Sequence, residues 1–191
     1  MNESDRMNKR FAKKKIILGV SGSIAAYKAC ELIRDLREEG ASVTCVMTNS
    51  AQKFVTPLTL KALSANPVYA DPFSNEADWA VLHTTLADEA DLILVCPASA
   101  NVIARLASGM ANDLVTSVVL ASKAKVLIVP AMNDNMYAHP ITQENIVRLK
   151  KIYHFTDPIK GELVCGRKGL GHIADTKTIL QTAHTILSRK R

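Results

Sequence analysis

The sequence of 191 residues has no long hydrophobic run, no closely spaced cysteine pair and no internal repeat. No apolar stretch approaches the ~20 residues that a membrane-spanning helix needs, so we expect no membrane partner. Residues 1–15, MNESDRMNKRFAKKK, lack the apolar core of a secretory signal and are expected to be a flexible basic tail. Residues 16–191 are long enough for one hydrophobic core and are expected to form a single domain.

The four cysteines form no CxxC pair and have no histidine at zinc spacing, so the sequence predicts no metal site. Cys30, Cys45 and Cys96 lie in apolar patterns, where a thiol packs as a small hydrophobe. Cys165 differs because the segment Val164–Gly171 is rich in glycine and carries two cations. That setting favours the thiolate and is typical of a reactive cysteine. Cysteine usage of this kind indicates a reducing, cytoplasmic location.

The formal net charge is +6, and much of it comes from the two ends of the chain. The charge therefore gives no reason to expect a nucleic-acid partner. A basic body favours a phosphorylated small-molecule substrate. Hydrophobic residues make up 48% of the chain, a proportion typical of a globular protein.

Apolar runs alternate along the chain with segments of helical periodicity. The expected strands are Lys15–Val20, Val43–Met47, Leu92–Cys96 and Val126–Val129, with a short one near Tyr153. The expected helices run from Ile24 to Gly40, over 51–54, 57–64, 79–89, 113–121 and 142–151, and onward from Ser99 and Asp175. This alternation predicts an α/β fold: a doubly wound, mainly parallel sheet with helices on both faces, in three layers of the flavodoxin or Rossmann type.

Two turns after the first two strands carry groups suited to a phosphate. The first runs from Gly19 to Ile24, and its Gly22 and Ser23 permit close backbone approach at the start of a helix. The second, Thr48 to Ser50, offers hydroxyl donors. The first turn is not G-x-G-x-x-G, so the dinucleotide fingerprint is absent. An ordinary tight turn remains the alternative.

Two further strands end in a proline followed by amide side chains. Pro97 to Asn101 follows one strand, and Pro130 to Tyr137, PAMNDNMY, follows the next. Because strand ends of a parallel sheet form ligand sites, we expect these loops to converge on one site. Asn133 and Asn135 can donate and accept hydrogen bonds, and the neighbouring methionines can pack on an apolar ring. A polar loop with two core methionines is the alternative.

Together, PASANVIARLASGMANDLV and PAMNDNMY resemble the flavin-dependent cysteine decarboxylases, and the resemblance runs from about Ile16 to Asp175. Within that family the chain is most similar to the enzymes that decarboxylate phosphopantothenoylcysteine in coenzyme A biosynthesis. The resemblance implies FMN as the cofactor and a phosphorylated thiol as the substrate. It also implies a homotrimer or dodecamer with FMN at the subunit interfaces.

The resemblance also implies roles for individual residues. The residues implied to hold FMN are Gly22, Ser23, Ile24, Thr48, Ser50, Ser99, Ala100, Asn101, Val102 and Ala131, with Phe54 as a cover for the ring. His83 aligns with the family's active-site base, and Cys165 would donate the proton that completes the reaction. The substrate would be bound by Asn133, Met136 and Ala131.

The chain departs from the family pattern at several positions. Asp88 and Glu89 stand where the family has a basic residue and a tryptophan, and Tyr137 replaces another tryptophan. His172 and Ile173 stand where Arg-Met is common. These changes bear on the substrate contacts rather than on the base.

Three other functions remain open. One is a peptidyl-cysteine decarboxylase, which would stop at the enethiol and would need no Cys165. Another is a flavin-binding regulatory protein without enzyme activity, although such proteins carry acidic extensions that this sequence lacks. The third is a flavin prenyltransferase, whose motifs differ from PAMNDNMY. We also expect the chain to lack a second domain for ligating cysteine to phosphopantothenate.

Overall fold

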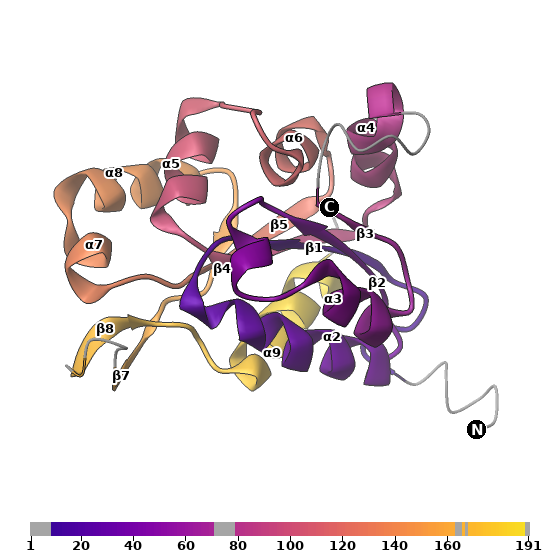
Figure 1. Ribbon diagram of the computed structural model, residues 1–191, viewed down its shortest axis with the longest axis horizontal. Coiled ribbons are helices and arrows are strands. Elements are labelled where there is room, and N and C mark those ends of the chain that lie inside the picture. Colours follow the sequence, from indigo (N-terminus) through magenta and orange to yellow (C-terminus); the bar gives the residue numbers. More distant parts are fainter. Residues whose placement is uncertain (1–8, 71–78, 163–165, 167, 190–191) are drawn as a thin grey trace.

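The computed structural model describes residues 9–70, 79–162, 166 and 168–189. At its centre lies a six-stranded parallel sheet with the strand order β3-β2-β1-β4-β5-β6 (Figure 1). The strands are β1 (Lys15–Val20), β2 (Ser42–Met47), β3 (Val68–Tyr69), β4 (Leu92–Ala98), β5 (Lys125–Pro130) and β6 (His154–Phe155). The predicted doubly wound α/β fold is confirmed.

Helices cover both faces of this sheet (Figure 1). One face carries α2 (Lys28–Glu38), α3 (Pro57–Ser64) and α9 (Thr176–Ser188); the other carries α4 (Trp79–Glu89), α5 (Ala100–Ser108), α6 (Leu114–Ala121) and α8 (Pro140–Leu149). Successive strand residues point to opposite faces, so Leu92 and Leu94 pack in one core while Ile93 packs in the other. Burial on both sides explains why these strands read as continuous apolar runs. None of the described helices is long and apolar enough to cross a membrane.

The strand order places a topological switch point between β1 and β4. The chain runs outward from β1 to β2 and β3, then returns to the other side of β1 and continues through β4, β5 and β6. The loops that leave β1 and β4 therefore turn in opposite directions and open a crevice at the carboxyl ends of the strands. The loops predicted to bind a ligand all leave this edge of the sheet.

Two segments predicted to be loops have regular structure. The motif PAMNDNMY contains a short helix, α7 (Asp134–Ala138). Part of the predicted glycine-rich loop is strand β8 (Lys168–His172), which pairs antiparallel with β7 (Ile159–Glu162). Glycine-rich strands show no apolar alternation, so periodicity could not identify this hairpin.

The structure corrects the prediction of a flexible tail for residues 9–15. Phe11 is fully buried, and its N–H donates to the carbonyl of Glu39 at 2.9 Å. Its ring also meets the ring of His184 edge to face, with centroids 6.0 Å apart. The flexible tail was predicted from the basic composition of this segment. Burial of the large Phe11 ring stabilises the folded position of the segment despite those charges. Residues 1–8 of the predicted tail lie outside the described residues.

Candidate active site

The buried hydroxyl of Ser21 joins the two strand ends at the switch point. Its Oγ donates to the carbonyl of Pro97 at 2.7 Å and accepts from the N–H of Ser99 at 2.8 Å. Ser21 follows β1, whereas Pro97 and Ser99 belong to the end of β4 and the turn after it. One side chain therefore fixes the relative position of two segments: the first turn predicted to bind a phosphate (residues 19–24) and the PASAN loop (residues 97–101).

The two turns predicted to bind a phosphate lie against each other. A Cβ atom on Gly22 would come within 2.5 Å of the Cβ of Ser50, so only glycine permits this approach. The Ser23 Oγ caps the short helix η1 (Ile24–Tyr27) by accepting from the N–H of Ala25 at 3.3 Å. Hydroxyls and backbone N–H groups at this end of the site make it a donor-rich surface for an anion.

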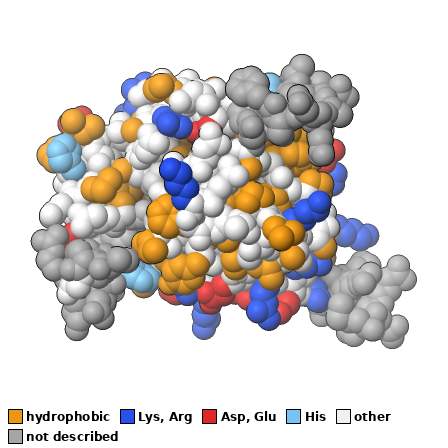
Figure 2. Space-filling model, viewed as in Figure 1, with side chains coloured by type: hydrophobic (Ala, Val, Ile, Leu, Met, Phe, Trp, Pro, Cys, Tyr) orange, Lys and Arg blue, Asp and Glu red, His pale blue; other side chains and the backbone are white. Residues whose placement is uncertain are grey.

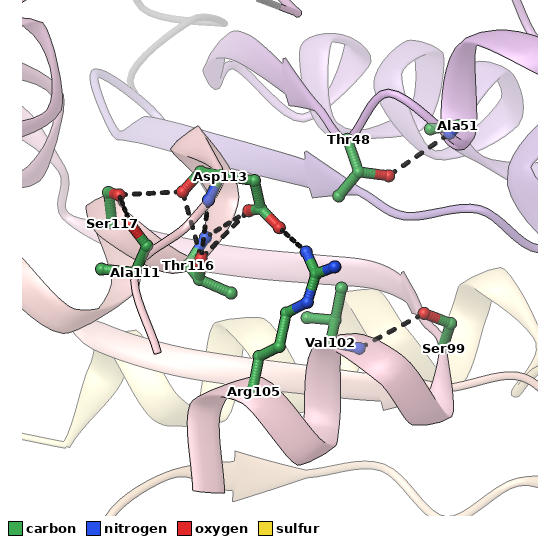
Figure 3. Close-up of polar contacts among 9 residues, drawn as sticks. All are labelled: Thr48, Ala51, Ser99, Val102, Arg105, Ala111, Asp113, Thr116 and Ser117. Atoms are coloured by element: carbon green, nitrogen blue, oxygen red, sulfur yellow. Dashed lines mark hydrogen bonds and ion pairs between the residues drawn. The ribbon is translucent and has the colours of Figure 1, made fainter. Parts of the chain in front are cut away.

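A side-chain hydrogen bond also orders the second of these turns, Thr48 to Ser50. The Thr48 Oγ1 accepts from the N–H of Ala51 at 3.3 Å, at the start of η2 (Ala51–Lys53) (Figure 3). Thr48 is buried and Ser50 is exposed, so the turn offers one fixed and one accessible hydroxyl.

The loops after β4 and β5 are joined to each other and to the hairpin. Ala131 N–H donates to the carbonyl of Ala98 at 3.1 Å, and Met132 N–H donates to the carbonyl of Gly171 at 3.2 Å. Ser23 Oγ also lies 3.3 Å from the carbonyl of Ala131. These backbone contacts hold three loops from distant parts of the sequence around one space.

Asn133 has a hydrogen-bonding pattern that determines what it can offer a ligand. Its Oδ1 accepts from the N–H groups of Asn135 at 3.0 Å and Met136 at 3.4 Å and so caps α7. With the oxygen engaged, the amide nitrogen is the group that can donate to a ligand. A carboxylate or a carbonyl oxygen fits such a donor.

The β7–β8 hairpin packs closely on the loop that contains Asn133. A Cβ atom on Gly171 would lie 2.2 Å from the carbonyl oxygen of Met132, and one on Gly169 would lie 2.6 Å from Asp134 Oδ2. Both glycines are therefore required for this packing.

An ion pair between Arg105 and Asp113 forms another wall of the site (Figure 3). Arg105 Nη1 lies 2.6 Å from Asp113 Oδ2, and the two side chains are 26% and 14% exposed. Asp113 also caps α6 through a capping box with Thr116. The pair joins the second turn of α5 to the N-cap residue of α6.

These parts enclose a cavity of about 1310 Å³. The predicted site residues that line it are Gly22, Ser23, Ile24, Thr48, Ser50, Ser99, Ala100, Asn101, Val102, Ala131, Asn133 and Met136. Further lining residues that the sequence analysis did not assign to the site include Tyr27, Arg105, Asn112, Asp113 and His172. Arg105, Asn112 and Asp113 lie within the quoted segment PASANVIARLASGMANDLV, but only their tertiary contacts place them at the cavity.

Three predicted site residues have a different outcome. Phe54 is 48% exposed and is not among the described residues that line the cavity. His83 is partly buried on α4, which lies at the opposite end of the molecule from the hairpin, and it is likewise not a lining residue (Figure 1). Cys165 lies outside the described residues, although Gly166 next to it lines the cavity. The cavity of a single copy is thus assembled without the predicted base.

Comparison with known proteins gives a family and close relatives. The Flavoprotein family model matches residues 4–188. The chain is 49% identical over 171 residues to a probable phosphopantothenoylcysteine decarboxylase of Streptococcus mutans, covering 88% of this chain and 96% of that protein. It is 46% identical over 169 residues to a coenzyme A biosynthesis bifunctional protein of Bacillus subtilis, of which it spans only 42%.

The chain is also similar to solved structures of decarboxylases. A PPC decarboxylase mutant complexed with pantothenoylaminoethenethiol matches with a TM-score of 0.83 and 29% identity, over 93% of this chain and 100% of that one. An FMN-dependent cysteine decarboxylase, SpaF, matches with a TM-score of 0.80 and 26% identity, over 94% and 99% of the two chains.

Proposed function

The chain belongs to the Flavoprotein family, and from that membership we propose that it is an FMN-dependent carboxy-lyase that converts phosphopantothenoylcysteine to phosphopantetheine. The observation that carries this proposal is that one cavity brings the two phosphate turns, the PASAN loop and the PAMNDNMY loop together. The Streptococcus mutans relative, matched over 96% of its length, bears the name of that activity. The reaction would be a step of coenzyme A biosynthesis.

The residues present fit FMN. Ser23, Thr48 and Ser50 provide neutral donors for a phosphate, and Gly22 allows their two turns to approach each other. The segment Ser99–Val102 and the backbone at Ala131 would hold the ring. Small-molecule sites commonly measure about 300–1,000 Å³, so the cavity of about 1310 Å³ has room for a flavin and a substrate side by side.

The proposed roles of the protein groups follow from their positions. Bound FMN would supply the hydride acceptor that oxidises the substrate thiol. The oxidised carbon–sulfur group can then take up the electrons released when CO₂ leaves. Asn133 would hold the substrate carboxylate through its amide nitrogen, because its oxygen already caps α7. His83 would accept a proton. Cys165 would return one to the enethiol, and this proton together with the hydride held by the reduced cofactor would give the saturated product.

We propose that His83 acts in the cavity of a second copy of the chain. It is not among the described residues that line the cavity of its own copy, while Ile24 and Tyr27 line that cavity and are each 56% exposed. Figure 2 shows hydrophobic side chains exposed across the face of the molecule that it draws. A homotrimer or dodecamer with FMN between subunits would cover Ile24 and Tyr27 and supply His83.

A cytoplasmic location accords with the described cysteines. Cys30, Cys45 and Cys96 are free thiols. Reduced thiols persist in a reducing compartment.

The proposal is tested by mixing the purified protein with phosphopantothenoylcysteine and measuring released CO₂ and product mass. The wild-type protein should yield phosphopantetheine. Cys165→Ser should still release CO₂ but give a product lighter by two hydrogens, because serine is a far weaker proton donor than a thiol. If the variant yields the saturated product at an unchanged rate, Cys165 has no such role. Activity only on a peptide ending in cysteine would favour the peptidyl-cysteine decarboxylases instead.

A further inference from the structure

Arg105 stands apart from the other residues of the cavity wall. Among the described lining residues it is the only lysine or arginine, and therefore the only permanent positive charge. The turns that would receive the phosphate carry hydroxyls and backbone N–H groups instead. Arg105 itself lies on α5 and belongs to neither of these turns.

Asp113 holds the Arg105 guanidinium in place. Its Oδ1 accepts from the Thr116 N–H at 2.9 Å and from the Thr116 hydroxyl at 3.1 Å, so the carboxylate is anchored at the start of α6. Its Oδ2 accepts a hydrogen bond from Arg105 Nη1 at 2.6 Å. A guanidinium has five N–H groups, and this contact uses one nitrogen. In Figure 3 the rest of the group is turned away from Asp113, on the side of Thr48 and Ser99.

The position of Arg105 on α5 indicates what those donors would meet. Side chains of an α-helix lean toward its N-terminus. Arg105 therefore leans over the turn that contains Asn101 and Val102, which belong to the segment proposed to hold the flavin ring.

We propose that Arg105, positioned by Asp113, directs its charge at the flavin ring and favours the reduced cofactor. The inference rests on the proposed FMN site. Oxidised flavin takes up two electrons and one proton on reduction and so gains one negative charge. A nearby cation stabilises that charge, and protein charges near the ring are one means of tuning a flavin. In the proposed reaction the electrons come from the substrate thiol and later return to the enethiol.

The test measures the midpoint potential and the dissociation constants of oxidised and reduced FMN in the intact holoprotein without substrate. Arg105→Met should weaken binding of reduced FMN at least tenfold more than binding of oxidised FMN, which lowers the potential by about 30 mV or more for a two-electron couple. Arg105→Lys keeps the charge and should lie closer to wild type. Asp113→Asn keeps a good helix cap but removes the opposing charge, and should raise the potential.

Arg10→Met is the matched control. It removes an arginine from another ion pair, with Glu39, on the N-terminal segment and away from the cavity. This variant should leave the potential unchanged.

An unchanged potential in Arg105→Met, with only the substrate KM raised, would overturn the proposal and assign Arg105 to the substrate carboxylate or phosphate. Shifts of the same sign in Arg105→Met and Asp113→Asn would also overturn it, because they would indicate a general rearrangement. If Arg105→Met does not fold, Asp113→Asn decides, and an unshifted potential in that variant refutes the idea. Failure of the wild-type protein to bind FMN would refute the proposed function separately.

Discussion

At the scale of single residues, the Ser21 hydroxyl holds the two strand ends at the switch point together through its hydrogen bonds. Ser21→Ala leaves the Ser99 N–H and the Pro97 carbonyl without their partner in a buried place. Unsatisfied buried groups of this kind cost about 1–3 kcal/mol, so the free energy of unfolding should fall by that amount in urea titrations. Ser188→Ala at the exposed end of α9 is the control and should change it by less than about 0.5 kcal/mol. Equal effects of the two substitutions would contradict the assigned role of Ser21.

The buried thiols provide a second prediction at this scale. Burial raises the pKa of Cys45 and the pKa of Cys96 to about 12. Because the thiolate is the nucleophile, native protein treated with iodoacetamide near pH 8 should remain unmodified at both positions. Peptide mapping by mass spectrometry measures this, and the same treatment in guanidinium chloride should label both. Native-state labelling as fast as in the unfolded chain would show that the strands open readily.

At the scale of the elements, the β7–β8 hairpin should control activity without controlling the fold. A Cβ atom on Gly171 would meet the Met132 carbonyl at 2.2 Å, so Gly171→Ala must displace the hairpin or the Asn133 loop. A displacement near 1 Å can cost about 100-fold in rate. We expect kcat/KM to fall by about that factor while FMN stays bound, since the phosphate turns lie elsewhere.

Leu170→Ala is the control for this substitution. Leu170 lies on the same strand but is exposed, and its truncation adds no atom against Met132. Activity should change little. A Gly171→Ala variant as active as Leu170→Ala would show that the hairpin adapts without moving the loop.

The cap of α9 predicts how stability depends on pH. The Thr178 hydroxyl, followed by the Thr178 N–H, holds the pKa of Asp175 below its ordinary value. A depressed folded-state pKa means that the carboxylate stabilises the protein above the unfolded pKa, which is about 3.9. That stabilisation is lost as the pH falls through the folded-state pKa.

Asp175→Asn retains a capping oxygen but does not titrate. Wild type should therefore be more stable than this variant at neutral pH, and the gap should close below about pH 4. Thermal unfolding of both proteins from pH 7 to pH 3 measures this. A gap that stays constant over the whole range would show that the charge of Asp175 is irrelevant.

At the scale of the whole molecule, the position of His83 predicts complementation between subunits. His83→Asn should keep FMN but lose activity by about 10²–10⁴-fold, as expected for a general base. Gly22→Ala should lose FMN, because its Cβ would strike Ser50. Each variant alone should be nearly inactive.

Co-expression of the two variants should restore activity. In a mixed ring, about a quarter of the sites combine an intact FMN cavity with an intact His83 from the neighbouring copy. If His83 acted within its own chain, no site in the mixture would be complete. Inactivity of mixed oligomers that are shown to contain both variants would therefore contradict the shared site.

The sequence by itself determined the layers of the fold and about half of the cavity wall. Strands buried on both faces must be continuously apolar, and helices that cover them must be apolar on one side, so both periodicities are visible along the chain. Parallel strands also send their carboxyl ends to one edge, which is why the loops at Pro97 and Pro130 could be expected to form one site from the strand pattern. The family resemblance added the turns at Gly22 and Thr48 to that site.

Only the tertiary structure decided which side chains meet. The contacts of Ser21 with the PASAN loop, of Arg105 with Asp113 and of Phe11 with the body depend on how separate elements pack, and no local pattern encodes them. The same holds for the absence of His83 from the described lining of its own cavity. Periodicity records which face of an element is buried, whereas the partner across that face is set by the packing of the whole chain.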